Sequence, residues 1–230
     1  MADWATIAEV GTAAGTLVLA LATFGATRSA NRAARVAERA FEARLRPLLV
    51  PSRQEDPAEK IMWGDQHWTR LPGGRAAVEI GEAAVYLTMS LRNVGSGMAV
   101  IHGWWAAASP GFALELQPEV LQHPELQQHP DLDDFRPQGR DLYVPPGDSS
   151  FWQGAFRDRD ERDEREREEM ADAIRRREMI AVFLLYGDHE GGQRTVSRFY
   201  LVPPGENADD PNAWIESVNR HWNLDRNDPR

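Results

Sequence analysis

Histidines and the acids around them are the first candidates for chemistry in this chain. His123 and His129 each open an HP(E/D)L tetrapeptide, and the two copies start six residues apart. A metal ion held there would need further ligands, and the nearby acids are Glu125, Asp131 and Asp133. Two proline-initiated turns in an acidic loop account for the repeat without a metal. We therefore expect no metal site, and keep as the alternative function a hydrolase or metal-dependent enzyme with its site in the loop 117–140.

An acid beside a histidine also occurs at Asp188–His189, which are the residue types of a catalytic dyad. They belong to the stretch Tyr186-Gly187-Asp188-His189-Glu190-Gly191-Gly192, whose glycines are typical of a hairpin loop between two strands. Neighbouring residues at a loop tip seldom converge on one substrate. The sequence therefore predicts a turn here and no catalytic pair.

The composition excludes several kinds of site and partner. The chain of 230 residues has no cysteine, which rules out disulfides, thiolate nucleophiles, iron–sulfur clusters and cysteine-based zinc sites. Gly95 and Gly97 lack the lysine and the following helix of a phosphate-binding loop. A net charge of −10 argues against a nucleic-acid partner. We expect no catalytic residue and no cofactor, which favours a protein that is not an enzyme.

The elements that must position any site begin with an uncharged N-terminal stretch. No residue from Val10 to Ala26 is charged and no Lys or Arg precedes it, whereas seven arginines occur in residues 28–53. A run of about 20 largely apolar residues is the length of a membrane-spanning helix. The positive-inside rule then places the C-terminal side in the cytoplasm. We expect a single-pass anchor in residues 1–27, with a cleaved signal sequence and an ordinary soluble helix as the alternatives.

Two pairs of residues around this stretch are candidates for binding. Gly11 and Gly15 form a GxxxG spacing, which lets two helices approach closely in a membrane and would permit a homodimer. The alternative is that glycine and alanine are simply common in this stretch. Arg28 and Arg32 follow the apolar stretch closely enough to contact anionic lipid headgroups. The helical pattern continues through residues 28–46 and ends before a proline, and its later arginines are expected to face solvent.

Alternating residues predict a mainly β domain over residues 47–209. The segment Val85–Arg92 alternates apolar and polar residues, so one face of this strand should belong to the core and the other should face solvent. Trp104 and Trp105 should point to opposite faces of the next strand. Turns rich in glycine and proline separate several strands, an arrangement typical of an antiparallel sandwich. The further strands expected are MAVIHGWWAA, DLYV, SSFWQGAF, MIAVFLLYG and TVSRFYLV.

Two helices are expected beside the strands. Residues 157–178 are dominated by acidic and basic residues paired four positions apart, and predict a charged helix facing solvent. In residues 210–230, Asp210 before Pro211 is a favourable helix start, and apolar residues then recur every four positions. These apolar residues are Trp214, Val218 and Trp222. We therefore expect a C-terminal helix packed on the domain.

The order of these elements resembles a loose group of small single-span bacterial membrane proteins with an immunoglobulin-like β-sandwich and no established function. Two segments carry the likeness, Leu91-Arg92-Asn93-Val94-Gly95-Ser96-Gly97-Met98-Ala99 and the strand–turn–strand from Tyr186 to Phe199. Met98 stands where the group usually has a proline. The resemblance implies a fold and a topology and carries over no functional residue. It is consistent with a membrane-tethered, non-enzymatic module that binds an unknown protein partner.

Overall fold

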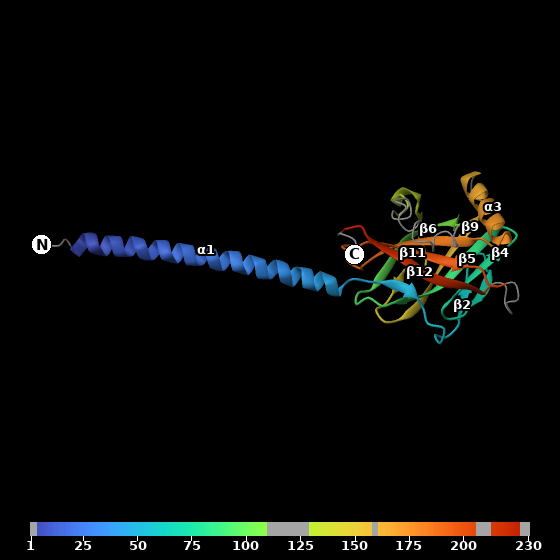
Figure 1. Ribbon diagram of the computed structural model, residues 1–230, viewed down its shortest axis with the longest axis horizontal. Coiled ribbons are helices and arrows are strands. Elements are labelled where there is room, and N and C mark those ends of the chain that lie inside the picture. The colour runs from blue at the N-terminus through green and yellow to red at the C-terminus, as the bar shows by residue number, and fades with distance from the viewer. Residues whose placement is uncertain (1–3, 110–128, 158–160, 206–212, 226–230) are drawn as a thin grey trace. The chain divides into compact units, whose positions relative to one another are not determined.

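The computed structural model describes residues 4–109, 129–157, 161–205 and 213–225 of the chain (Figure 1). The chain divides into two compact units, Met1–Arg44 and Leu45–Arg230. The first unit is the helix α1 (Trp4–Arg44), and the second is built mainly from antiparallel strands with a second helix, α3 (Glu161–Arg175).

Helix α1 joins the expected anchor and the expected arginine-rich helix into one element of 41 residues. Alanine, leucine, arginine and glutamate dominate it, and these residues have high helix propensity. Its apolar side chains are exposed: Leu17, Leu21 and Phe24 expose 63, 64 and 67% of their surface. Within the described residues, none of the helices combines the length and the apolar character needed to cross a membrane.

Ten strands of the second unit form one curled antiparallel sheet, counted over the described residues, and β2 and β3 form a separate hairpin. The strands are β1 (Leu49–Pro51), β2 (Glu59–Met62), β3 (Trp68–Leu71), β4 (Arg75–Ile80), β5 (Ala84–Asn93), β6 (Ala99–Ser109), β7 (Arg136–Pro137), β8 (Tyr143–Val144), β9 (Ser149–Arg157), β10 (Met179–Gly187), β11 (Thr195–Val202) and β12 (Ala213–Asn223). Their order is β1-β5-β4-β12-β11-β10-β6-β7, with β9 paired to β5 and β8 paired to β6. The strands expected from the alternation, including the hairpin of β10 and β11, are confirmed.

The two ends of the curled sheet approach each other around the core. Strand β9 pairs with β5 at one end, and β7 and β8 pair with β6 at the other. Trp152 and Phe156 of β9 nevertheless belong to the same core cluster as Trp104 of β6. The rings of Trp104 and Trp152 meet edge to face with their centroids 5.4 Å apart. We call the place where β9 faces residues 136–140 the seam of the sheet.

Strand β5 is buried on both faces, so the expectation of a solvent-facing side is wrong. Leu87 and Met89 lie in the main core as expected. On the opposite face Tyr86 is covered by the β2–β3 hairpin, whose Ile61 packs in the same second cluster. Thr88, which is fully buried, donates a hydrogen bond to the carbonyl oxygen of Trp152 at 2.6 Å. Alternation predicts a solvent face only where no other element covers it.

Helix α3 confirms the expected helix in residues 157–178, with narrower bounds. It packs on β9, β5, β6 and β10. Met170, Ala171 and Ala173 are its buried apolar residues. Its charged first half does not face solvent throughout, because the side chain of Asp163 is buried against Arg136. Trp104 and Trp105 do lie on opposite faces of β6, the first in the main core and the second against Phe183.

The expected C-terminal helix is wrong, because Ala213–Asn223 is the strand β12, paired with β11 and β4. A spacing of four residues suits a strand as well as a helix, since every second residue of a strand lies on the same face. Trp214 and Val218 share the main core, and an irregularity in the β11–β12 register after Arg198 places Trp222 in another cluster. The helix-start pair Asp210–Pro211 lies outside the described residues.

The Asn93–Gly97 loop fixes the chain where it enters the second unit. Asn93 Oδ1 accepts hydrogen bonds from the backbone N–H groups of Leu48 and Gly95 at 3.1 and 3.0 Å. Gly97 lies so close to this segment that a Cβ would overlap the carbonyl of Leu45. The two glycines of this loop thus serve close backbone packing.

Candidate functional site

The residues of the expected metal motif are only partly described, and those that are have structural contacts. His123 and Glu125 lie outside the described residues. His129 Nδ1 lies 2.7 Å from the Pro130 carbonyl oxygen, and its ring meets Trp222 edge on. Asp131 accepts a hydrogen bond from the backbone N–H of Asp133 and so begins a short 3₁₀ turn. Over the described parts of the chain, no three potential metal ligands come together.

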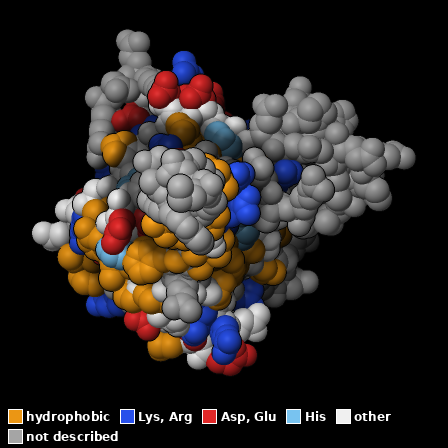
Figure 2. All heavy atoms as spheres, turned by 90° about the vertical axis from the view of Figure 1, so that its left-hand side faces the viewer, with side chains coloured by type: hydrophobic (Ala, Val, Ile, Leu, Met, Phe, Trp, Pro, Cys, Tyr) orange, Lys and Arg blue, Asp and Glu red, His pale blue; other side chains and the backbone are white. Residues whose placement is uncertain are grey.

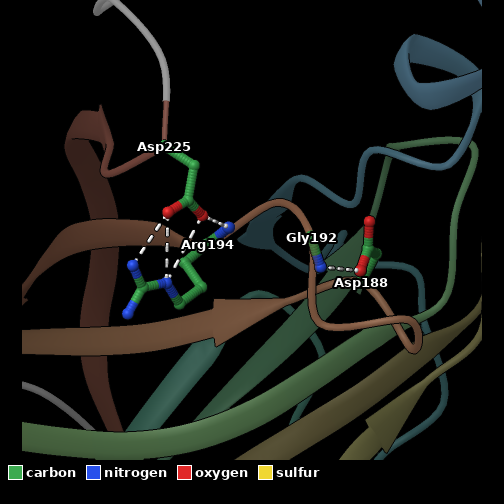
Figure 3. Close-up of polar contacts among 4 residues, drawn as sticks. All are labelled: Asp188, Gly192, Arg194 and Asp225. Carbon is green, nitrogen blue, oxygen red and sulfur yellow. Dashed lines mark hydrogen bonds and ion pairs between the residues drawn. The ribbon is translucent and has the colours of Figure 1, made fainter. Parts of the chain in front are cut away.

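The Asp188–His189 pair forms a turn, as expected. Asp188 is buried, and its Oδ1 accepts a hydrogen bond from the backbone N–H of Glu190 at 3.1 Å. The same oxygen accepts a second one from the Gly192 N–H at 2.9 Å (Figure 3). Close by, Arg194 donates to both carboxylate oxygens of Asp225 (Figure 3). This hydrogen bonding lowers the pKa of Asp225 below its ordinary value, although burial opposes it. The geometry fastens the loop to the end of β12.

The candidate residues of α1 are exposed where they are described. Arg28 and Arg32 are exposed, and a Cβ added at Gly15 would meet no atom within 4 Å. The side-chain surroundings of Gly11 lie outside the described residues. Hydrophobic side chains, drawn in orange, also make up a large part of the face shown in Figure 2.

A serine and a histidine meet inside the sheet, in the geometry of a nucleophile and its base. Ser197 Oγ lies 2.6 Å from His221 Nδ1 and 2.8 Å from the hydroxyl of Tyr186. Ser197 is fully buried, so its hydroxyl cannot reach a substrate. Burial lowers the pKa of His221, which keeps the ring neutral in this interior network. The network is structural, and Tyr186 also accepts a hydrogen bond from the Leu49 N–H.

A concave site lies at the seam, with a volume of about 280 Å³. We call it the seam pocket. Its walls are Trp63 and Gly64 after β2, Trp104 of β6, residues 136–140, and residues 153–155 and 157 of β9. Gly154 is required in this wall, because a Cβ there would come within 2.6 Å of the Trp152 ring.

Arg136 forms the charged floor of the seam pocket. Its Nη2 donates to Asp163 Oδ1 at 2.6 Å and also pairs with Glu166, both on α3. Its guanidinium lies over the rings of Trp104 and Phe156, 5.6 and 5.1 Å from their centroids. Burial disfavours the charge, but the hydrogen bonds with the two carboxylates outweigh it and raise the pKa of Arg136.

The β2–β3 hairpin supplies the opposite wall. The ring of Trp63 packs edge to face against Tyr86, with centroids 5.0 Å apart. The Tyr86 hydroxyl donates to Asp65 Oδ2 at 2.6 Å, and Arg157 pairs with the same carboxylate oxygen at 3.1 Å. Burial and the bond to Asp65 raise the pKa of Tyr86 to about 12. Tyr86 therefore stays a hydrogen-bond donor and holds the hairpin in place.

Two glutamines complete the pocket across the seam. Gln138 Nε2 donates to the backbone oxygen of Gln153 at 3.4 Å, and Gln153 Nε2 donates to Asp141 Oδ2 at 2.6 Å. The buried Gln153 Oε1 and Trp63 Nε1 have no hydrogen-bond partner among the described residues. A buried polar atom without a partner is costly, and these two atoms belong to residues of facing walls of the pocket.

Sequence reasoning missed the seam pocket as a site, although its residues 136–140 lie at the end of the loop 117–140 named in the alternative function. Its residues come from separate segments between Trp63 and Arg157, and no fixed spacing connects them. The short run Arg136-Pro137-Gln138-Gly139-Arg140 was the available signal, but two arginines in a loop are usually solvated. No protein-family model matches the sequence, and no curated protein or solved structure matches the chain.

Proposed function

We propose that this protein is a membrane-tethered, non-enzymatic interaction module, in which α1 enters a bilayer and the β-rich unit lies on the cytoplasmic side. The observation that carries this proposal is the exposed apolar surface of α1. Leu17, Val18, Leu19, Leu21 and Phe24 all expose more than 60% of their surface. Water does not stabilise such a surface, whereas lipid does.

Two further features of α1 support an apolar environment. Thr23 and Thr27 donate their hydroxyl hydrogens to carbonyl oxygens one turn earlier, both at 2.8 Å, as polar groups in lipid must be satisfied inside the helix. The first basic residues after the uncharged stretch are Arg28 and Arg32, at the distance where anionic headgroups would meet them.

The sheet supports the recognition part of the proposal. Core packing between β9 and β6, which belong to opposite ends of the strand order, favours two facing layers. An immunoglobulin-like sandwich is the fold we propose for this unit, and such folds present loops and sheet edges to partners. Ser197 and Asp188 are both engaged in the interior contacts described above, which favours binding over catalysis.

Cysteine scanning tests the tether, and the chain contains no native cysteine to interfere. In intact cells we expect a membrane-impermeant maleimide to label the Ala2→Cys variant, and the Ser96→Cys variant only after the cells are permeabilised. Labelling of both only after permeabilisation would place α1 on the inner membrane surface and overturn a spanning helix. Recovery of the full-length protein in the soluble fraction without detergent would overturn the tether itself.

A homodimer through Gly11 and Gly15 is part of the same proposal. A small surface at these positions lets two helices pack backbone to backbone in lipid. We expect Gly15→Leu to abolish crosslinking between copies in membranes, and Gly25→Leu, which adds the same side chain elsewhere on α1, to leave it intact. Equal crosslinking in the two variants would exclude this dimer face.

The alternative is a hydrolase or metal-dependent enzyme with its site in residues 117–140. Elemental analysis of the purified protein decides between the two, since the interaction module needs no metal. One tightly bound ion per chain that is lost in the His129→Ala variant would favour the enzyme.

A further inference from the structure

We propose that the seam pocket binds a singly charged aromatic carboxylate, such as a small aromatic acid or the C-terminus of a chain that ends in an aromatic residue. This inference rests on the proposed function as an interaction module and names the chemistry that the module recognises. The argument comes from the charge of the pocket, its shape and its unsatisfied polar atoms.

The charge of the pocket calls for an anion. Arg136, Arg140 and Arg157 line it, and its lining contains no Asp or Glu, although the chain as a whole has a net charge of −10. Arginine binds carboxylates through paired, charge-assisted hydrogen bonds, so these residues suit an acidic group.

The three arginines differ in whether they already pair with a carboxylate, and this decides which of them a ligand can bind. Arg136 is paired with two carboxylates, and Arg157 is paired with Asp65. Arg140 is exposed and has no ion pair with any described residue. Arg140 is therefore the arginine of the lining that is left for a ligand, and one guanidinium pairs with one carboxylate.

The shape of the pocket calls for a flat, partly apolar body. The side chains of Trp63 and Trp104 form part of the lining, and a Cβ added at Gly64 or Gly139 would meet open space. Aromatic rings prefer such offset or edge-to-face neighbours. At roughly 30 Å³ for each water, the volume of about 280 Å³ holds about nine waters, and so a ligand of about ten non-hydrogen atoms.

The location of the pocket in the sheet also distinguishes it from other surface sites. It lies where the two ends of the curled sheet meet without pairing, and Gln138 and Gln153 make a hydrogen bond across the seam. A ligand bound here would touch both ends at once. Trp63 Nε1 and Gln153 Oε1, which have no partner among the described residues, belong to opposite walls of the pocket.

The test uses purified full-length protein and matched probes. Benzoate has the proposed ring and charge, benzamide has the same shape without the charge, and acetate has the charge without the ring. Binding is followed by NMR of the tryptophan indole N–H signals, with those of Trp63 and Trp104 assigned by substitution to Phe. We expect benzoate to shift these two signals saturably, and benzamide and acetate to bind about tenfold or more weakly.

Variants place the binding in the pocket. Gly139 lines the pocket and a Cβ there meets no atom within 4 Å, so Gly139→Leu adds a bulky side chain at the pocket without displacing the chain. We expect this variant to abolish benzoate binding and the matched Gly205→Leu variant, also open but outside the pocket, to retain it. Arg140→Gln should weaken binding about tenfold, while Arg70→Gln, an exposed arginine elsewhere, should not.

The outcomes separate this inference from the proposed function. Equal affinity for benzoate and benzamide, absence of saturable binding, or binding that survives Gly139→Leu would overturn the pocket proposal and leave the tether untouched. A peptide ending in Phe that binds about tenfold more tightly with a free than with an amidated C-terminus would assign the carboxylate to a protein partner. Benzoate binding without any peptide binding would assign it to a free small molecule.

Discussion

Helix α1 and strand β5 differ in which side chains they expose: α1 exposes apolar side chains, and β5 buries polar ones. In α1, Leu17 and Phe24 expose about two thirds of their surface, whereas in β5, Thr88 is fully buried and Ser90 is 5% exposed. The polarity of a residue thus predicts its burial poorly in both elements. What decides it is the surroundings. The β2–β3 hairpin covers Tyr86 of β5 and Ser90 donates a hydrogen bond to Glu216 of β12, while no described residue covers the apolar side chains of α1.

The largest effect that can test this contrast comes from the core face of β5. Leu87 is fully buried in the main cluster. Leu87→Ala should lower the free energy of unfolding of the β-rich unit by about 2–5 kcal/mol, because the lost contacts leave a cavity. Denaturant titration of the full-length protein measures it. A loss below about 1 kcal/mol would mean that this strand is not in the core.

The second prediction concerns Glu216, a carboxyl buried among the polar residues of β5 and its neighbours. Its Oε1 accepts a hydrogen bond from Ser90 Oγ at 2.6 Å, but burial raises its pKa well above the ordinary value of 4.5. Below that ordinary value both the folded and the unfolded states are protonated. As the pH rises above it, only the unfolded state ionises freely, so stability falls until the pH passes the folded-state pKa.

Glu216→Gln should remove this decline. The neutral amide keeps an acceptor for Ser90, so we expect the variant to gain roughly 1–3 kcal/mol over the wild type at neutral pH, and little or nothing at pH 4. Thermal unfolding at several pH values provides the measurement. Parallel stability curves for the two proteins would show that Glu216 is not the source of the pH dependence.

A smaller effect is expected from the polar face of β5. Thr88→Val keeps the size of the side chain and removes the hydrogen bond to the Trp152 carbonyl, so it should cost about 1–2 kcal/mol. This is more than a surface threonine would cost. A change in the free energy of unfolding within about 0.5 kcal/mol would mean that Thr88 faces solvent, as the simple alternation predicts.

The smallest effect is expected in α1. Leu21→Ala should leave the unfolding of the β-rich unit unchanged within about 0.5 kcal/mol, because Leu21 is exposed. The same substitution should nevertheless reduce the fraction of protein recovered with membranes. If this variant destabilised the β-rich unit, the Leu21 side chain would have to pack against other residues, which would contradict its exposure.

Local signals predicted much of this fold. The alternation at Val85–Leu91 and the glycine turn at Tyr186–Gly192 predicted β5 and the β10–β11 hairpin, since each pattern is complete within a short segment. The prediction of a helix in residues 213–223 was wrong because a four-residue spacing suits both a helix and a strand. Only the pairing with β11 decides between the two structures. The hydrogen bond of Asp163 to Arg136 joins α3 to β7, a long-range contact that no local pattern contains.

The same reasoning explains why the seam pocket was not predicted. Trp63, Arg136 and Gln153 are far apart in sequence, and they meet only because the sheet curls until its ends approach. Each of them has an ordinary local interpretation, as an aromatic core residue, a solvated cation or a polar strand residue. Their shared chemistry depends on the register of every strand between them.

The close packing of the Asn93–Gly97 loop has a mechanical consequence. The chain passes from α1 at Arg44 directly into Leu45–Leu48, which this loop grips through hydrogen bonds such as Val94 N–H to Leu48 O at 2.9 Å. Strand β1 adds only three register pairs with β5. A force that pulls on α1 would therefore act first on these few hydrogen bonds, and only later on the long strand pairs β5–β9 and β10–β11. The contacts of this junction would break first, and the rest of the sheet would stay folded.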